Sequence, residues 1–409
     1  MNYIRKRLLV LKTYSIVSLY EKMYNEHRGE IMIIQSNNIY VSGTFIPAQI
    51  EMENGIIKEV YDYGTKKCDY DYGNDKIIPG MIDVHCHGGV AFDTNDANRE
   101  GLVAWAKNLL KEGITSFCPT TVTQSEEVLL KAVKNVADVV KEGYEGSEIV
   151  AIHFEGPYLN VKNKGAQPEQ FIIKPTVEQF KKYQEAANGL IKIITMATEH
   201  DDDFELTKYC AKTGVNVSIG HSGCTYQQAA LAVANGANGM THTYNGMNGL
   251  HHREPSLVGA AMNLRDTYAE VICDGNHVSW PAINALVTAK GRDYCIMIDD
   301  ALCVKGCEPG SYFLGGNEIE VKENGSAYLK GTNTLAGGTL QFNYQLKNLV
   351  EEVRIPIDWA INMATINPAR YLGIEDRKGR ICAGWDADLV VLDRDFEVVQ
   401  VYQSGVIVK

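Results

Sequence analysis

The sequence predicts a mixed α/β fold in which a TIM-like (β/α)8 barrel carries a small β-sandwich domain built from both chain ends. Three observations lead to this prediction: eight apolar, strand-like segments along the middle of the chain, helical patterns between most of them, and strand-rich stretches at both ends. Eight strand–helix units match the count of a barrel, although a doubly wound sheet gives the same alternation. Polar residues at the strand ends favour the barrel, because its strands open onto one face where active sites are built.

Both ends of the chain consist of short strand-like runs separated by turns. The pair Asn54-Gly55 lies between two apolar alternations and is typical of a hairpin turn. We expect residues 32–78 and 379–409 to form the small β domain together. In residues 1–31, basic residues precede an apolar run that charged residues interrupt, and no small-residue cleavage site follows. This stretch is interpreted as an N-terminal extension with no assigned function.

The middle of the chain, residues 79–378, alternates strand-like and helical patterns. The predicted strands are 81–85, 114–118, 149–154, 191–196, 215–220, 238–242, 269–273 and 294–299. Helical patterns between them include 100–111, 125–141, 176–187 and 225–234. Residues 303–338, rich in glycine and strand-forming residues, are expected to form a hairpin insertion into the barrel and not a domain boundary.

Composition narrows the choice of partners and compartment. The formal net charge of -12 disfavours nucleic acid and anionic membranes as partners, and no apolar run approaches the roughly 20 residues of a membrane-spanning helix. A phosphorylated ligand would therefore need local positive charge. The 10 cysteines have irregular spacings and form no paired CxxC motifs, which predicts reduced thiols in a cytoplasmic protein. Cys303 and Cys307 could bind a metal, but loop and core thiols are the better interpretation.

Histidines and acidic residues cluster at or just after the ends of the predicted strands. They are His85, His87, Glu155, His221, His242, His277 and Asp300. A single histidine is more often structural than a ligand, but several at corresponding strand ends would converge in one pocket of a barrel. The sequence therefore predicts a polar pocket at the carboxyl ends of the strands.

The residue types in this pocket suit a divalent metal ion. In His85-Cys86-His87, an extended strand puts both imidazoles on one side. Neutral imidazoles with a carboxylate suit zinc, iron or a similar ion, which activates water for hydrolysis. Glu155 can bridge two ions, and Asp300 can ligate or accept a proton. Asp83 could orient the histidines as a hydrogen-bond partner.

Several motifs resemble a known family. PGMIDVHCHGG resembles the first-strand signature of the amidohydrolase superfamily. HFEGPYLN, IGHSGCTYQQ, THTYNGMN and HHREPSLVGA look like successive blocks of the N-acetylglucosamine-6-phosphate deacetylase family, and ATINPARYLGI and GRICAGWDADLVVLD look like its C-terminal blocks. The resemblance covers roughly 75–395. HxEGPxxN together with HxYNxM and REP is much more specific than the HxH alone.

The resemblance implies hydrolysis of N-acetyl-D-glucosamine 6-phosphate to D-glucosamine 6-phosphate and acetate in amino-sugar catabolism. It implies that Glu155, His221 and His242 bind a divalent metal, zinc or iron. A second ion would be held by His85 and His87 together with Glu155, giving one or two ions per subunit. Asp300 would be the general base and acid. The neighbouring Asp299 is a register alternative, but the family's Asp-Ala pair, with glycine six residues after the Asp, selects Asp300.

The resemblance also implies a substrate-binding set and a homodimer. The residues in this set are Asn245, Gly246, Arg253, His277, Gln167, Ala336 and Gly337. Asn245 and Gly246 would bind the phosphate, and Arg253 would reach it from the other subunit, a role that suits the guanidinium fork. Gln167 stands where many members have a sugar-contacting histidine, which makes the choice of sugar epimer less secure.

Three alternatives stay open at this point. A deacetylase of N-acetylgalactosamine 6-phosphate differs only in the sugar epimer. A cyclic-amide hydrolase shares the barrel and the HxH, but many such enzymes bridge their metals with a carboxylated lysine, and here the third strand ends in Glu155. An inactive sugar-phosphate-binding homologue would share the fold without the chemistry, although every expected ligand and the acid are present.

Overall fold

The computed structural model describes residues 31–409, except 315 and 324. The prediction of an N-terminal extension over 1–31 therefore lies outside the described residues, apart from Ile31 itself. In the described part of the chain, no helix combines the length and the apolar character needed to cross a membrane.

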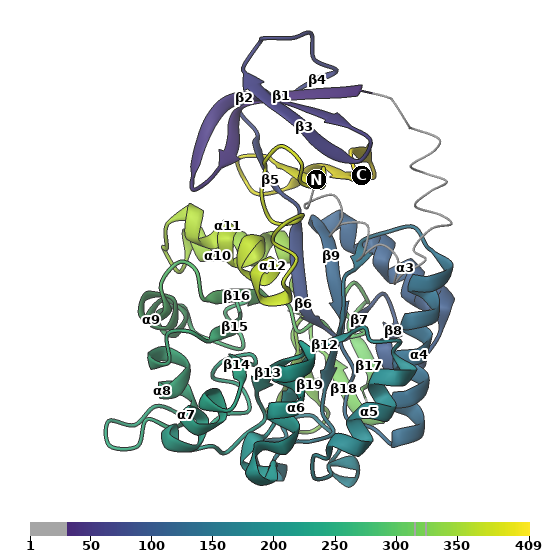
Figure 1. Ribbon diagram of the computed structural model, residues 1–409, viewed down its shortest axis with the longest axis vertical. Helices are drawn as coiled ribbons and strands as arrows, with labels where there is room; N and C mark the ends of the chain where they lie inside the picture. The colour runs from purple at the N-terminus through teal and green to yellow at the C-terminus, as the bar shows by residue number, and fades with distance from the viewer. Residues whose placement is uncertain (1–30, 315, 324) are drawn as a thin grey trace.

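Strands from both chain ends form one sheet at the top of the molecule in Figure 1. These strands are β1 (Ile31–Val41), β2 (Thr44–Glu53), β3 (Ile56–Asp62), β4 (Tyr70–Asp71), β5 (Lys76–Pro79), β21 (Leu389–Leu392), β22 (Val398–Gln403) and β23 (Val406–Ile407). The order is β23-β22-β21-β5-β1-β2-β3, with β4 beside β1. Hydrogen bonds thus join these strands in a single sheet, where the sequence predicted the two sheets of a sandwich. Asn54 and Gly55, with φ of 54° and 77°, make the predicted tight turn between β2 and β3.

The middle of the chain supplies parallel strands. They are β6 (Met81–Cys86), β9 (Ile114–Pro119), β10 (Glu148–Ile149), β11 (Ile152–Glu155), β12 (Ile191–Met196), β13 (Asn216–Ile219), β14 (Ala237–Met240), β15 (Tyr268–Ile272) and β16 (Cys295–Ile298). They form a three-stranded sheet, β10-β9-β6, and a six-stranded sheet, β11 to β16 in order. Single bridges, Thr120 to His153 and Cys86 to Ala301, join the two sheets at their edges. The predicted strand 149–154 is split, because its first part pairs with β9 and its second with β12.

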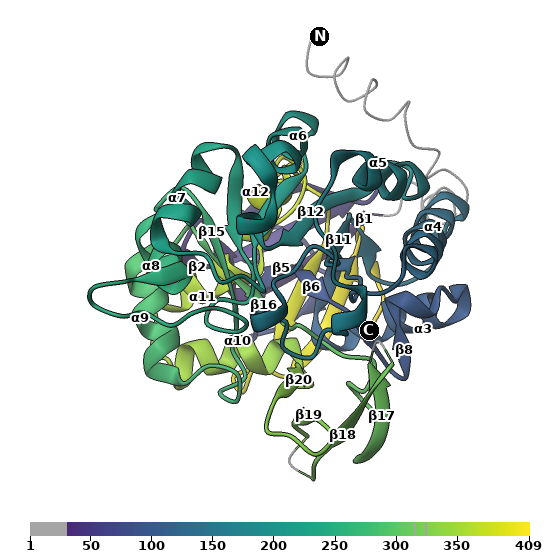
Figure 2. The ribbon, with the colours of Figure 1, turned by 90° about the horizontal axis from the view of Figure 1, so that it is seen from below.

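Helices surround these strands (Figure 2). The α-helices are α3 (Arg99–Leu109), α4 (Glu126–Glu142), α5 (Val177–Ala186), α6 (Glu205–Thr213), α7 (Tyr226–Ala234), α8 (Ser256–Asn263), α9 (Trp280–Lys290), α10 (Phe342–Glu351), α11 (Ile357–Ala364) and α12 (Ile366–Leu372). Short 3₁₀ turns are η1 (Thr94–Asp96), η2 (Leu110–Glu112), η3 (Val161–Asn163), η4 (Glu169–Phe171), η5 (Thr198–His200) and η6 (Asp202–Phe204). The four helices predicted from periodicity are confirmed, and Ser125, Thr176 and Thr225 cap three of them through their hydroxyl oxygens.

Apolar packing separates the two ends of the parallel strands. β5 leads directly into β6, so the terminal sheet lies at the amino ends of the strands. At that end Ile82, Ile296, Ile366 and Tyr371 belong to one buried apolar cluster that includes α12. Polar side chains are therefore left to gather at the opposite, carboxyl end.

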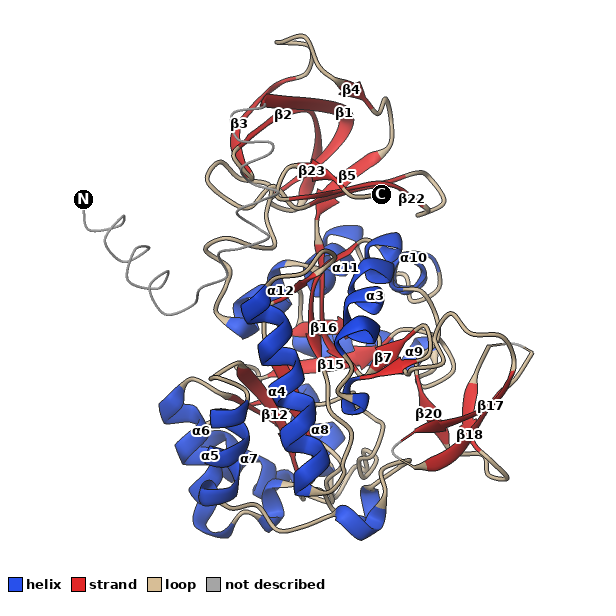
Figure 3. Ribbon diagram, turned by 90° about the vertical axis from the view of Figure 1, so that its right-hand side faces the viewer, coloured by secondary structure: helices blue, strands red, loops and turns tan. Residues whose placement is uncertain are grey.

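Residues after β16 form a side sheet that projects from the molecule (Figure 3). Its strands are β17 (Gly310–Leu314), β18 (Asn317–Val321), β19 (Ala327–Leu329) and β20 (Leu335–Gly337). The insertion is thus a four-stranded antiparallel sheet, larger than the predicted hairpin. The thiols of Cys303 and Cys307, at its base, each contact a backbone carbonyl oxygen. β7 (Gly88–Gly89) and β8 (Phe92–Asp93) form a separate small ribbon.

β20 returns to the end of β16 through a close backbone contact. The Gly338 N–H donates to the Asp300 carbonyl over 2.7 Å, and the Leu302 N–H donates to the Gly338 carbonyl over 3.1 Å. A Cβ at Gly338 would lie 2.0 Å from the carbonyl oxygen of Asp299, so only glycine fits there. This contact places Ala336 and Gly337 next to Asp300.

Candidate active site

A cavity of about 240 Å³ opens at the carboxyl ends of the strands. The predicted site residues that line it are His87, Glu155, Gln167, His221, His242, Asn245, Gly246, His277, Asp300, Ala336 and Gly337. His85 is fully buried and contacts Glu155 and Asp300, which both face the cavity. Arg253 is exposed and does not line the cavity. Residues more than 200 positions apart therefore meet in one pocket.

Three of these residues have a strained backbone. His221, His242 and Asp300 each lie two residues beyond the end of a strand, β13, β14 and β16 respectively, where the sequence predicted the strand ends themselves. Their φ angles of 46°, 29° and 50° are in the left-handed region, which costs non-glycine residues of order 1–3 kcal/mol. Such strain typically marks functional sites, and here it turns three side chains toward the cavity.

Glu155 is the centre of the cluster. Its Oε1 atom lies 3.2 Å from His242 Nε2, 3.4 Å from His221 Nε2 and 3.5 Å from His85 Nε2. His221 Nε2 and His242 Nε2 are 3.1 Å apart. Glu155, His221 and His242 therefore each offer one ligand atom to a common point, as the sequence predicted.

A second ligand group adjoins the first. His85, His87 and Asp300 also offer atoms to one point, with Asp300 Oδ1 lying 3.4 Å from His85 Nε2 and 3.1 Å from His87 Nε2. Glu155 Oε2 is 3.4 Å from His87 Nε2, so the two oxygens of Glu155 face both groups.

The hydrogen bonds of the imidazoles fit metal binding. The Nδ1 atoms of His87, His221 and His242 lie 3.2, 2.9 and 3.1 Å from the backbone carbonyl oxygens of residues 120, 163 and 245. A carbonyl oxygen only accepts, so Nδ1 carries the proton and Nε2 keeps a free lone pair toward Glu155. His85 Nε2 and Glu155 Oε1 are buried atoms without a hydrogen-bond partner. The donor set therefore fits a divalent cation, which would be the missing partner of both atoms.

The pKa shifts differ among the members of the cluster. Burial lowers the pKa of His85 well below its ordinary value. Burial alone would raise the pKa of Glu155, but the imidazoles of His85 and His221 hold that pKa well below its ordinary value. Burial opposes a charge on His87, whereas the neighbouring carboxylates of Asp300 and Glu155 raise its pKa well above its ordinary value. Metal binding needs an ionised carboxylate beside unprotonated imidazole. The shifts of Glu155 and His85 favour these states, whereas the raised pKa values of His87 and His221 favour a positive charge, which a metal ion would supply in place of a proton.

Gln167 lines the cavity and is also hydrogen-bonded within the protein. Its Nε2 donates to Glu155 Oε2 over 2.6 Å, and its Oε1 accepts from the Thr123 N–H over 2.8 Å. The sequence predicted a sugar contact at this position. In the structure both ends of the amide are bonded within the protein, and Gln167 orients Glu155.

The two adjacent aspartates point to opposite sides. The side chain of Asp300 is 14% exposed and lines the cavity. Asp299 is buried and pairs with Lys305, which also contacts Glu112, and Gln345 donates to Asp299 over 3.0 Å. Burial raises the pKa of Asp299 to about 7. Only Asp300 can reach a ligand in the cavity.

Two acidic partners of the site histidines were not predicted from the sequence. Glu270, in β15, lies 3.0 Å from His85 Nδ1, and Asp274 lies 2.7 Å from His277 Nδ1. The only signal for Glu270 was an acid inside the apolar run AEVIC. Asp83 accepts the His85 N–H over 3.1 Å, so its contact is with the backbone and not with an imidazole.

The cavity lacks a cationic side chain of its own. Among the described residues that line it, none is lysine or arginine. Arg253 belongs to the exposed loop before α8, which projects from the body of the molecule (Figures 1 and 2). A phosphate group bound here would need its cation from outside this lining.

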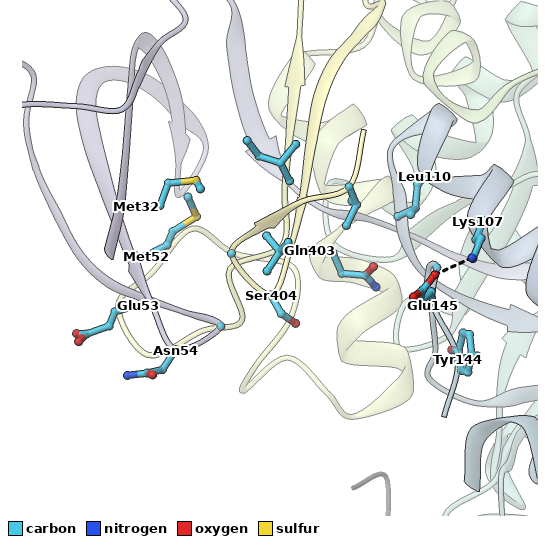
Figure 4. A pocket seen from close by; sticks show the side chains of 16 residues that line it. Met32, Met52, Glu53, Asn54, Lys107, Leu110, Tyr144, Glu145, Gln403 and Ser404 are labelled. Atoms are coloured by element: carbon cyan, nitrogen blue, oxygen red, sulfur yellow. Dashed lines mark hydrogen bonds and ion pairs between the residues drawn. The ribbon is translucent and has the colours of Figure 1, made fainter. Parts of the chain in front are cut away.

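A larger hollow of about 670 Å³ lies between the terminal sheet and α3 (Figure 4). Met32, Met52 and Gln403 line it from the sheet, and Lys107 and Glu145, paired over 2.7 Å, line it from the other side. Its described lining includes no histidine and no cysteine. Imidazole ligands for a metal therefore line the smaller cavity and not this hollow.

Comparison with known proteins agrees with this geometry. The model of the family described as "Amidohydrolase family" matches residues 77–408. The chain belongs to the amidohydrolase family. This confirms the resemblance inferred from the motifs and makes the protein a hydrolase of mixed α/β fold.

Curated relatives and a solved structure narrow the group within this family. An N-acetylglucosamine-6-phosphate deacetylase of Bacillus subtilis is 38% identical over 79% of this chain and 82% of its own length. An N-acetylgalactosamine-6-phosphate deacetylase of Escherichia coli O157:H7 is 31% identical over 87% of this chain and 93% of its own. The structure of a mutant N-acetyl-D-glucosamine-6-phosphate deacetylase from Mycobacterium smegmatis, in complex with N-acetyl-D-glucosamine-6-phosphate, is similar with a TM-score of 0.88. It is 28% identical and covers 93% of this chain and 100% of its own.

Proposed function

We propose that this amidohydrolase removes the acetyl group from N-acetyl-D-glucosamine 6-phosphate, yielding D-glucosamine 6-phosphate and acetate. The observation that carries the proposal is the convergence of Glu155, His221 and His242 on one point beside Asp300 in a cavity of about 240 Å³. The deacetylase relatives support the substrate class. The ten thiols, all unpaired, support a reducing, cytoplasmic setting.

The scaffold we infer is a closed (β/α)8 barrel. Its two parallel sheets would form one ring through the edge bridges from Thr120 to His153 and from Cys86 to Ala301. A closed ring explains why side chains from strands far apart in sequence share one mouth.

The metal we propose is zinc or iron, held by Glu155, His221 and His242. A second ion would be held by His85 and His87 together with Glu155 and Asp300. Histidine nitrogen with carboxylate oxygen is the donor set that these ions prefer. Such an ion supplies Lewis-acid activation of water and of the amide carbonyl.

Asp300 is proposed to move the proton. Its carboxylate faces the cavity, and the backbone contact between Asp300 and Gly338 fixes its position. Asp300 accepts a proton from the attacking water and donates it to the departing amine nitrogen. The C–N bond of the amide breaks as a C–O bond to the water oxygen forms, which leaves acetate and the free amine.

The substrate is proposed to lie along the remaining cavity wall. Asn245 and Gly246 would bind the phosphate, His277 would contact the substrate, with its ring fixed by Asp274, and Ala336 and Gly337 would line the sugar. Gln167, which lines the same cavity and donates to Glu155, would orient that carboxylate and contact the sugar. Because the described residues of the cavity lining include no lysine or arginine, Arg253 of a second subunit in a homodimer is proposed to neutralise the phosphate.

The second candidate substrate is N-acetylgalactosamine 6-phosphate. It is supported by the similarity to the Escherichia coli N-acetylgalactosamine-6-phosphate deacetylase. Acetate release by the purified protein should be compared on both epimers and on a cyclic amide. We expect turnover with the gluco epimer, its loss with a chelator and its return with zinc or iron(II). No acetate from either epimer in the metal-loaded protein would refute the proposed function.

A further inference from the structure

One of the four clustered histidines has a partner unlike the others. His87, His221 and His242 hydrogen-bond through Nδ1 to backbone carbonyls, whereas His85 Nδ1 lies 3.0 Å from the carboxylate of Glu270. A carboxylate partner fixes the ring and also makes its far nitrogen a more basic metal ligand. His85 therefore differs from the other three histidines in that a carboxylate, and not a backbone carbonyl, holds its Nδ1 atom.

Glu270 is a buried carboxyl group with few hydrogen-bond partners. Its side chain is 1% exposed. Its Oε1 has no hydrogen-bond partner, and apart from His85 its Oε2 meets only the His242 N–H, at a long 3.4 Å. Among the described residues, no lysine or arginine forms an ion pair with it. A buried carboxylate in this state is costly unless a positive charge balances it.

A positive charge that balances the Glu270 carboxylate would have to lie on or beside the His85 ring, its side-chain partner. His153 packs on the His85 ring but is fully used, since its Nδ1 and Nε2 bond the Val84 carbonyl and the Thr195 hydroxyl. A divalent ion on His85 Nε2, the buried atom that lacks a partner, supplies the charge without a proton.

We propose that Glu270 is a positioning residue for the second metal site, the one formed by His85, His87 and Asp300. Its carboxylate holds the His85 ring with Nε2 toward that ion, and its negative charge is needed for the ion to bind tightly. The ion at Glu155, His221 and His242 does not depend on it. This inference rests on the metal chemistry of the proposed function.

Glu270→Gln tests the inference, because it keeps the shape and an acceptor oxygen but removes the charge. Metal-free protein is titrated with zinc chloride, and bound zinc is counted by elemental analysis. We expect two zinc ions per wild-type chain. In Glu270→Gln the tighter ion stays, and the second binds roughly 10–100-fold more weakly. Glu112→Gln is the matched control: it changes a buried carboxylate that faces Lys305, and it should keep both ions.

Two results overturn the inference: a wild-type protein that binds one ion only, or a folded Glu270→Gln that binds both with wild-type affinity. If Glu270→Gln fails to fold by circular dichroism, Glu270→Asp keeps the charge but shortens the reach to His85. It should also weaken only the second ion, and unchanged affinity in it overturns the inference. If the wild-type protein is active and one of these metal-binding results is found, only the role of Glu270 is refuted. If the wild-type protein binds metal but is inactive, the proposed function is refuted.

Discussion

Two groups of possible metal ligands lie at opposite ends of the parallel strands. At the carboxyl ends, Glu155, His221 and His242 bring ligand atoms within reach of one ion. At the amino ends a second group, which we name the basal ion cluster, consists of Glu148, Asp386, Asp388, Arg377 and Lys378. Its three carboxylates also lie close enough together to hold a metal.

The two groups differ in how their charges are balanced. In the basal ion cluster Arg377 contacts Glu148 over 2.6 Å and Asp386 over 2.7 Å, and Lys378 contacts all three acids. Around Glu155, the side-chain partners are imidazoles and the amide of Gln167, and Oε1 has no hydrogen bond. Proximity of ligand atoms therefore does not by itself indicate a metal site. Carboxylates that lack a neighbouring lysine or arginine are the better indication.

The largest expected effect is a loss of activity on mutation at the carboxyl ends of the strands but not in the basal ion cluster. Asp300→Asn should keep the fold and the ion at Glu155, His221 and His242 but lower kcat about 10²–10⁴-fold, because the amide cannot accept the proton. Acetate release and metal analysis measure both quantities. Asp388→Asn, the same change in the basal ion cluster, should leave kcat of the folded protein unaltered. Full activity in Asp300→Asn would remove Asp300 from the mechanism.

The second effect is a loss of stability when a cation is removed from the basal ion cluster. Lys378→Met removes a cation that is 3% exposed and leaves Glu148 and Asp388 without its charge. The free energy of unfolding should fall by about 3–5 kcal/mol, as is typical when one partner of a buried pair is removed. Urea denaturation measures it. Unchanged stability, or a loss of bound metal, would break the distinction between the two ends.

Acid should reveal the same charge balance. Burial alone would raise the pKa of Glu148, but Arg377 and Lys378 hold that pKa below its ordinary 4.5. A lowered folded-state pKa gives stability above the ordinary pKa, and this stability is lost as pH falls toward the folded value. Wild type should thus exceed Glu148→Gln in stability at pH 7, with the gap narrowing below pH 4.5. A constant gap in urea unfolding across that range would contradict the role of the two cations.

The smallest effect concerns the cation that the cavity lacks. If Arg253 of a second subunit meets the phosphate, Arg253→Ala should raise KM about tenfold, equivalent to roughly 1.4 kcal/mol, with little change in kcat. Arg253→Lys should recover only part of this, because an ammonium lacks the guanidinium fork. Initial-rate kinetics at varied substrate would decide, and an unchanged KM in Arg253→Ala would remove this contact.

Much of the strand and helix pattern could be predicted, because apolar runs and capping hydroxyls are local signals. The histidines at strand ends were visible for the same reason. Glu270 was hidden in the apolar strand β15, since only its spatial neighbour His85 gives it meaning. Likewise, the bond between Gln167 and Glu155 and the pairing of Glu148 with Arg377, 229 residues apart, depend on tertiary contacts that no local pattern encodes.

The most direct test of the account is anomalous X-ray diffraction from crystals grown with zinc. A metal peak should lie about 2.0–2.2 Å from the Glu155 carboxylate and from Nε2 of His221 and His242, with none in the basal ion cluster. A peak among Glu148, Asp386 and Asp388, or an active zinc-loaded crystal with no peak at Glu155, would contradict it.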